Sequence, residues 1–251
     1  MAEFDGIRAK LYAEALTDFP QAREGDIELM KKYLCPNPRE VILEVGAGNG
    51  LFSGVIADAL LPEGRLIVTD PSSEQLHGVA DLNRSNIEIR TEGTDTLILD
   101  ENSVGAIWSF GAMHHVFNKT TSFKNFFRCL KSGGRIVISD VFSGSTLAKH
   151  FDDRVAKFCA TGHEVVFWSR EYAESLCFLT GFGKPEFHDF NAKWVFNKKE
   201  DIGVFLYKLH AMTKTTEEEC LSGAEKILGI AEEGGKFYLN WPMTMMIIKK
   251  L

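Results

Sequence analysis

The stretch Val41-Ile42-Leu43-Glu44-Val45-Gly46-Ala47-Gly48-Asn49-Gly50 decides the fold. Its first five residues are mostly apolar, which is typical of a short strand buried in a parallel sheet. The closely spaced glycines that follow let the backbone turn sharply and approach a ligand at the carboxyl end of that strand. The stretch therefore predicts a strand, a glycine loop and a ligand site at the edge of a sheet.

Strand-like and helix-like segments alternate on both sides of this loop. The other strand-like runs are 66–69, 87–90, 106–110 and 135–141, and the helix-like runs are 51–61, 73–84 and 122–130. Such alternation favours an α/β fold of the doubly wound, Rossmann-like kind, with a mostly parallel sheet and right-handed crossovers. Two later strand-like pieces, at 186–196 and 238–249, are expected to pair like a hairpin at one end of the sheet.

Three regions are expected within one structural domain. Residues 1–38 have helical spacing and are predicted to form an N-terminal helical cover, and residues 39–142 form the ligand-binding core. Residues 143–251 are predicted to complete the sheet and to add helical insertions that cover a substrate.

The composition and net charge of the chain narrow down the kind of protein and the partners that it can bind. The chain has 251 residues, of which 45% are hydrophobic and 25% charged, which is ordinary for a soluble globular protein. A net charge of −7 argues against a nucleic-acid partner, because phosphate backbones would be repelled. Five scattered cysteines, no signal peptide and no apolar run long enough to span a bilayer predict a cytoplasmic protein without a membrane partner. Nothing in the sequence indicates the oligomeric state.

Two acidic residues indicate the kind of ligand. Glu44 stands two residues before the first glycine, where a carboxylate suits a positively charged ligand and is unhelpful beside a pyrophosphate. Leu51 occupies the position at which a dinucleotide-binding GxGxxG motif would have its last glycine. Asp70 ends the second strand, where an acid accepts hydrogen bonds from ribose hydroxyls. The structural alternatives are a helix-capping role for Glu44 and a turn before Pro71 for Asp70.

Four motifs in order resemble the class I S-adenosylmethionine (SAM)-dependent methyltransferases, especially the branch that acts on small molecules. The motifs are LEVGAGNG at 43–50, IVTDPS at 67–72, DENSVGAIWSFGAMHHV at 100–116 and LKSGGRIVISDV at 130–141. The resemblance implies a seven-stranded sheet whose last strand is antiparallel, SAM as the cofactor, and methyl transfer to a small-molecule acceptor.

The resemblance also implies roles for individual residues. Glu44 would hold the glycine loop or the methionine ammonium, and Asp70 would hold the ribose. Tyr12 and Arg23 would reach the carboxylate of SAM if the N-terminal helices fold over the cofactor; the alternative is that these helices cover a sheet edge. The other implied cofactor-binding residues are Gly46, Ala47, Gly48 and Gly50 at the methionine part, Pro71, Ser72, Thr94 and Asp95 at the adenine, and Ser109, Phe110 and Gly111 at the sulfonium.

The candidate catalytic residues are His115 and Asp140. Methyl transfer from a sulfonium needs mainly alignment, and a general base only where the acceptor must lose a proton. His115 matches the histidine that the family often has in this turn more closely than His114 does, and Asp140 ends a strand at the rim of the cleft. The alternative for either histidine is a structural role within the turn. No metal site is expected, and His163 is interpreted as a surface or packing residue.

Two other functions remain open at this point. A SAM-binding scaffold or regulatory protein without catalysis would keep the same loop and the same Asp70. An NAD(P)-dependent oxidoreductase would share the strand, the loop and the acid, although Leu51 and Glu44 argue against it. The acceptor atom, whether O, N, C or S, is also left open.

Overall fold

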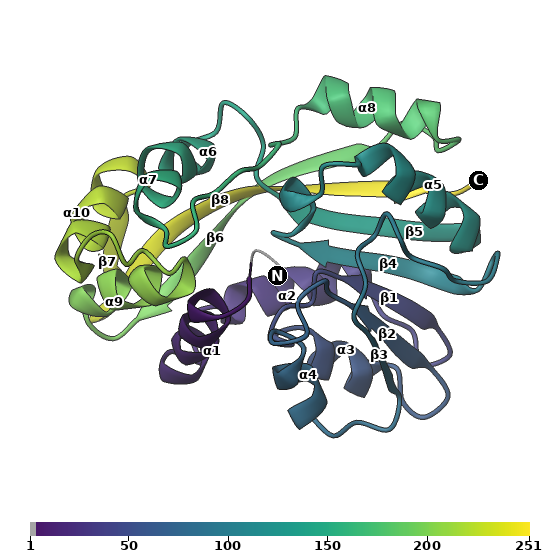
Figure 1. Cartoon of the computed structure of the whole chain (residues 1–251), viewed down its shortest axis with the longest axis horizontal. Coiled ribbons are helices and arrows are strands. Elements are labelled where there is room, and N and C mark those ends of the chain that lie inside the picture. The colour runs from purple at the N-terminus through teal and green to yellow at the C-terminus, as the bar shows by residue number, and fades with distance from the viewer. Residues whose placement is uncertain (1–3) are drawn as a thin grey trace.

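The computed structural model describes residues 4–251, which fold around one sheet of eight strands (Figure 1). The strands are β1 (Val41–Val45), β2 (Arg65–Thr69), β3 (Ile87–Arg90), β4 (Val104–Phe110), β5 (Leu130–Asp140), β6 (Glu186–Phe196), β7 (Ile230–Glu233) and β8 (Lys236–Lys249). Their order is β3-β2-β1-β4-β5-β8-β6, with β7 paired to β8 outside this path.

The direction of the strands confirms the predicted fold class. Strands β1 to β5 pair in parallel, whereas β8 is antiparallel to both of its main neighbours, β5 and β6. The seven strands of the main path therefore match the predicted sheet with an antiparallel last strand. The eighth strand, β7, was not predicted, because it has only four residues, none of them fully buried, and they show no apolar alternation. It forms a hairpin with β8 across Gly234 and Gly235, which both adopt positive φ angles.

Helices cover both faces of the parallel part because successive side chains of each strand point to opposite sides. On one face Ile42 of β1 packs with α2 (Glu24–Leu34), α3 (Ser53–Ala59) and α4 (His77–Asp81). On the other face Leu43 packs with α5 (Lys119–Cys129) and α8 (Arg170–Leu179). This is the doubly wound arrangement that the alternating segments predict.

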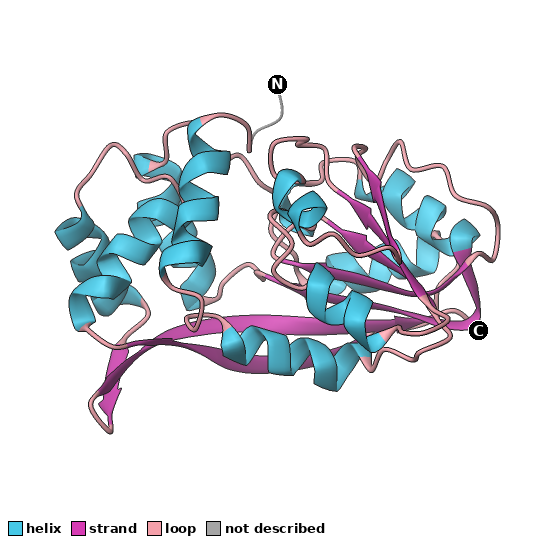
Figure 2. Ribbon diagram, turned by 90° about the horizontal axis from the view of Figure 1, so that it is seen from below, coloured by secondary structure: helices cyan, strands magenta, loops and turns pink. Residues whose placement is uncertain are grey.

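A second group of helices lies at the far end of β6 and β8, which continue well beyond the parallel strands (Figures 1 and 2). Its members are α1 (Ile7–Asp18), α6 (Thr146–His150), the π-helical turn η2 (Phe151–Val155), α7 (Ala156–Phe158), α9 (Lys199–Leu209) and α10 (Glu217–Ile227). They share one apolar core with the strand residues Trp194 and Trp241. The N-terminal helix α1 packs against α9 of this group.

The sheet register brings four strand ends to one edge. Val45 of β1 lies beside Thr69 of β2 and Ser109 of β4, and Phe110 lies beside Ser139 of β5. In open α/β sheets ligands bind outside the carboxyl ends of the strands, so the loops after these residues are the candidate site. Among residues 4–251, none of the helices has the length and apolar character needed to cross a membrane.

Candidate active site

The backbone conformation of the loop after β1 explains its glycines. Gly46 and Gly48 have φ angles of 65° and 53°, a region that favours glycine. A Cβ atom at Gly46 would also lie 2.3 Å from the Cβ of Ala112, so no larger residue fits there. The backbone N–H of Gly46 donates to the carbonyl oxygen of Thr69 (2.8 Å), which fixes the loop against the end of β2.

Asp70 connects this loop to the next one. One carboxylate oxygen accepts a hydrogen bond from the backbone N–H of Gly48 (3.0 Å), and the other accepts from the N–H of Ser72 (2.9 Å). Burial raises the pKa of the Asp70 carboxyl group, and these two hydrogen bonds oppose that rise. Asp70 therefore holds the glycine loop in place while its carboxyl group borders the cavity into which the loop faces.

Three neighbouring cavities open along the carboxyl edge of the sheet. The Asp70 cavity is lined by Asp70, Pro71, Thr94 and Asp95; the glycine-loop cavity by Tyr12, Gly46, Gly48 and Gly111. The third, here called the histidine pocket, is lined by His114, His115, His163, His210, Phe151 and Trp241. Phe4 and His115 line all three, so the cavities meet beside these two side chains.

The N-terminal segment contributes directly to this cleft. Tyr12 of α1 borders both the glycine-loop cavity and the histidine pocket, and a Cβ atom on Gly48 would lie 3.7 Å from its ring. Arg23 lines the histidine pocket and is buried, with its Nε donating to Asp26 (2.7 Å) and its Nη1 to the Tyr12 hydroxyl (3.4 Å). The geometry thus brings Tyr12 and Arg23 to the cleft, and their contact with SAM stays a prediction.

Other candidates divide into those that face the cleft and those that support it. Phe110, at the end of β4, lines the glycine-loop cavity and the histidine pocket. Ser109 instead donates its hydroxyl to the carbonyl oxygen of Val45 (3.1 Å) and is buried within the sheet. The residues that line none of the three cavities are Glu44, Ala47, Gly50, Ser72, Ser109 and Asp140.

Glu44 lies behind the glycine loop. Its carboxyl group is buried and accepts a hydrogen bond from the Ser53 hydroxyl at the start of α3 (2.6 Å). Burial raises the pKa of Glu44 to about 8, against the opposing effect of the Ser53 hydrogen bond. Glu44 lines none of the three cavities, and both roles that the resemblance implies for it stay predictions from the sequence.

The Glu44→Gln variant is expected to be more stable than the wild type at pH 8. Folded Glu44 keeps its proton up to about pH 8, whereas the unfolded chain loses it near its ordinary value of 4.5. The folded state then binds more protons in this window, so stability falls as pH rises from about 5 to 8. Glutamine keeps an oxygen for Ser53 and removes the titration. Urea denaturation of the unliganded protein at several pH values should show a free energy of unfolding that depends less on pH in Glu44→Gln than in the wild type.

The exposed Glu101→Gln change is the matched control. An equal pH dependence of the free energy of unfolding in wild type and Glu44→Gln would contradict the raised pKa of Glu44.

Asp140 is enclosed behind the histidine pocket. Its carboxylate accepts hydrogen bonds from the His114 backbone N–H (2.9 Å), the His114 Nδ1 (2.5 Å), the Trp168 indole (3.1 Å) and the Val141 N–H (2.8 Å). Burial alone would raise the pKa of Asp140, but the neighbouring His114 and these hydrogen bonds outweigh it and lower the pKa. Asp140 therefore stays ionised and orients His114, and a direct catalytic role for Asp140 remains a prediction from the sequence.

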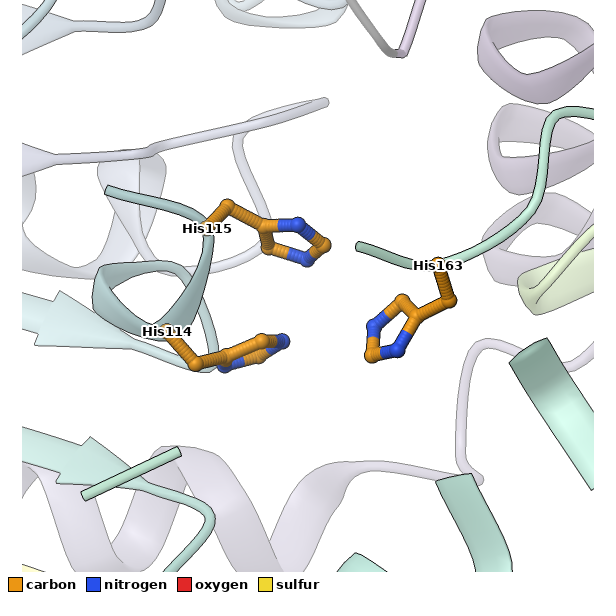
Figure 3. A group of neighbouring side chains, drawn as sticks. All are labelled: His114, His115 and His163. Carbon is orange, nitrogen blue, oxygen red and sulfur yellow. The ribbon is translucent and has the colours of Figure 1, made fainter. Parts of the chain in front are cut away.

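His114 and His163 line the histidine pocket but were not among the site residues predicted from the sequence. His114 lies in the 3-10 turn η1 (Met113–His115), and His163 lies in the loop between α7 and α8 (Figure 3). Together with His115 they place three imidazole rings within 4.2–5.6 Å of one another, measured between ring centres. The paired histidines were visible in the sequence, but no local pattern links them to His163.

Comparison with known proteins agrees with the predicted fold. Residues 43–138, from β1 to β5, match a family model described as a methyltransferase domain. An arsenite methyltransferase of Halobacterium salinarum is 29% identical over 115 residues, which are 44% of this chain and 29% of that protein. The chain spans a third or less of the length of the curated relatives that it matches.

Solved structures resemble almost the whole chain. The YcgJ protein of Bacillus subtilis aligns with 90% of this chain and 98% of its own, with a TM-score of 0.65 and 16% identity. A geranyl diphosphate C-methyltransferase of Streptomyces coelicolor aligns with 100% of this chain and 86% of its own, with a TM-score of 0.63 and 15% identity. At these identities the likeness is one of fold.

The match to the family model, the order of the strands and the glycine loop all indicate a methyltransferase fold. Residues 43–138 resemble a methyltransferase domain, and the whole chain has the Rossmann-like fold of its methyltransferase neighbours. A match to this family gives no support to the alternative of an NAD(P)-dependent oxidoreductase.

Proposed function

We propose that the chain is an enzyme that transfers the methyl group of SAM to a small-molecule acceptor bound in the histidine pocket. The observation that carries the proposal is the meeting of three cavities beside His115. With the adenosine in the Asp70 cavity and the methionine part in the glycine-loop cavity, the sulfonium lies where the histidine pocket begins. An acceptor in that pocket is then next to the methyl group.

The lining of the pocket supports transfer by direct displacement. Protein groups contribute to this reaction chiefly by aligning the acceptor with the S–CH₃ bond and by excluding water, and alignment alone is worth about 7–11 kcal/mol. Phe151, Trp194 and Trp241 provide rigid apolar walls for such alignment. His114 and His115 add basic nitrogens on the side where an acceptor O–H, N–H or S–H would lose its proton.

The size of the pocket favours a small acceptor. Its cavity volume is about 90 Å³, below the roughly 300–1,000 Å³ that is typical of sites for drug-sized molecules, so only a small acceptor fits without movement of the lining side chains. The names of two similar proteins each include a small molecule, which is arsenite in one and geranyl diphosphate in the other. A buried, aromatic-lined pocket is also poorly suited to a nucleic-acid strand, in agreement with the acidic composition.

The Leu209→Phe variant tests where the acceptor binds. Leu209 lines the histidine pocket at the end of α9, so a larger side chain there is expected to raise the KM for the acceptor at least tenfold and to leave SAM affinity unchanged. A panel of thiols, hydroxyls, amines and activated carbons, assayed for S-adenosylhomocysteine release and for the methylated product by mass spectrometry, supplies the acceptor.

Leu179→Phe makes the same chemical change on α8, at a residue that is 70% exposed, and serves as the matched control. Equal KM values for the two variants would place the acceptor elsewhere. SAM binding without product from any acceptor class would favour the alternative of a SAM-binding scaffold.

A further inference from the structure

We infer that His114, His115 and His163 form a binding site for a divalent transition-metal ion of the zinc type, placed at the wall of the histidine pocket. One ligand atom from each residue lies within 4.8 Å of the others, and Figure 3 shows the three side chains pointing toward one another from the η1 turn and from the loop that holds His163. The sequence predicts no such site, because His163 lies far along the chain from the histidine pair.

The spacing of the rings suits coordination by three imidazoles. Zinc binds histidine nitrogens at about 2.0–2.1 Å, so three imidazoles in tetrahedral positions have ring centres roughly 5 Å apart. The observed separations are 4.2 Å for His114–His115, 5.1 Å for His115–His163 and 5.6 Å for His114–His163. Small rotations of the side chains would bring the nitrogens to the separation of roughly 3.3 Å that such an ion requires.

His114 gives an independent indication of a ligand. Its Nδ1 is hydrogen-bonded to Asp140 (2.5 Å), so Nε2 is the ring nitrogen that is left to bind an ion. That Nε2 is buried, and among residues 4–251 it has no hydrogen-bond partner. An unpaired polar atom of this kind is costly unless a ligand binds it. Metal-binding histidines commonly donate their other ring nitrogen to a carboxylate, and His114 with Asp140 has this arrangement.

The third ligand is held in place from three sides. The loop of His163 is tied to the η1 turn by the Val166 N–H, which donates to the carbonyl oxygen of His114 (3.0 Å). Thr161 of the same loop accepts a hydrogen bond from Arg8 of α1 (3.0 Å), and the ring of Phe151 stacks on that of His163 with centres 4.8 Å apart. The loop thus presents His163 to the other two histidines.

The composition of the site indicates the class of metal and its use. Imidazole ligands suit zinc and similar borderline ions, whereas magnesium and calcium prefer oxygen ligands. Three protein ligands leave a fourth position open toward the pocket, which is the pattern of catalytic zinc sites. This use of the ion rests on the proposed function. An acceptor O–H or S–H would give its proton to water as its oxygen or sulfur binds the ion. That oxygen or sulfur would then bond to the methyl carbon of SAM while the bond between the methyl carbon and the sulfonium sulfur breaks. S-adenosylhomocysteine would be the leaving group.

Calorimetry and cobalt spectroscopy of chelator-stripped protein test the site without any assay of activity. We expect one Zn²⁺ or Co²⁺ ion per chain, and visible Co²⁺ bands of the intensity typical of four-coordinate ions. His163→Ala and His115→Ala should each weaken binding at least 100-fold, and Asp140→Asn about 10- to 100-fold. His77→Ala, at an exposed histidine of α4, is the matched control and should bind the ion as the wild type does.

The outcomes separate the metal site from the proposed function. Absence of binding, or binding that survives His163→Ala, would overturn the site, and so would an equal loss in His77→Ala. Full methyl transfer by metal-free protein would overturn the role of the ion in activating the acceptor and leave the methyltransferase assignment intact. Tight metal binding in a protein that methylates no acceptor would contradict the proposed function and leave the site standing.

Discussion

Replacing His114 by alanine is expected to lower turnover by about 10²- to 10⁴-fold while SAM affinity stays within a factor of three. The substitution removes the oriented Nε2 at the acceptor side of the cleft, whether that nitrogen takes a proton or binds a metal ion. His114 borders the histidine pocket but neither of the cavities assigned to SAM, so cofactor binding should be spared. Steady-state kinetics with the acceptor found by the panel, together with calorimetry of SAM, provide the two readouts.

Stability must be checked in the same variant. Asp140 keeps three backbone or indole donors after His114→Ala, from the main chain at residue 114, from Val141 and from Trp168, so the fold is expected to survive. His188→Ala, at an exposed residue of β6, is the matched control and should keep wild-type turnover. Wild-type turnover in folded His114→Ala would show that the histidine wall takes no part in the reaction.

Replacing Asp70 by alanine is expected to weaken SAM and S-adenosylhomocysteine binding by about 10- to 150-fold. A hydrogen bond to a charged group contributes about 1.5–3 kcal/mol, and each 1.4 kcal/mol is a factor of ten in affinity. The variant also loses the acceptor for the Gly48 N–H, which holds the glycine loop in position. Both effects act on cofactor binding, and calorimetry measures their sum.

Asp58→Ala is the matched control for this experiment. Asp58 is exposed, pairs with Arg84 on the surface and lies outside the three cavities, so its removal should leave SAM affinity unchanged. Unchanged affinity in a folded Asp70→Ala protein would show that the ribose binds elsewhere.

The parallel core was predictable because each of its strands carries its own local signal. The apolar runs that became β1, β2, β4 and β5 end at glycine or acidic residues, and the glycines of the loop mark the ligand edge. The pairing of β6 with β8 also followed from two late strand-like runs. The strand β7 was not predicted, because a segment of four residues with none fully buried has the same sequence pattern as a loop.

The site was predictable in part, for a related reason. Asp70 and Gly46 are placed by the strand that precedes them, so a local pattern is enough to bring them to the cleft. Glu44 and Asp140 also stand near strand ends, but whether such a side chain faces the cleft or is buried behind it depends on what packs there. The contact of His114 with His163 depends on how a long loop folds back, which no short pattern encodes.

Calorimetric titration of the purified chain with SAM, S-adenosylhomocysteine and NADH tests the central claim most directly. The account predicts that both SAM and S-adenosylhomocysteine bind with one site per chain and that NADH produces no measurable heat of binding. Tight binding of NADH without binding of SAM would contradict the assignment of the cleft.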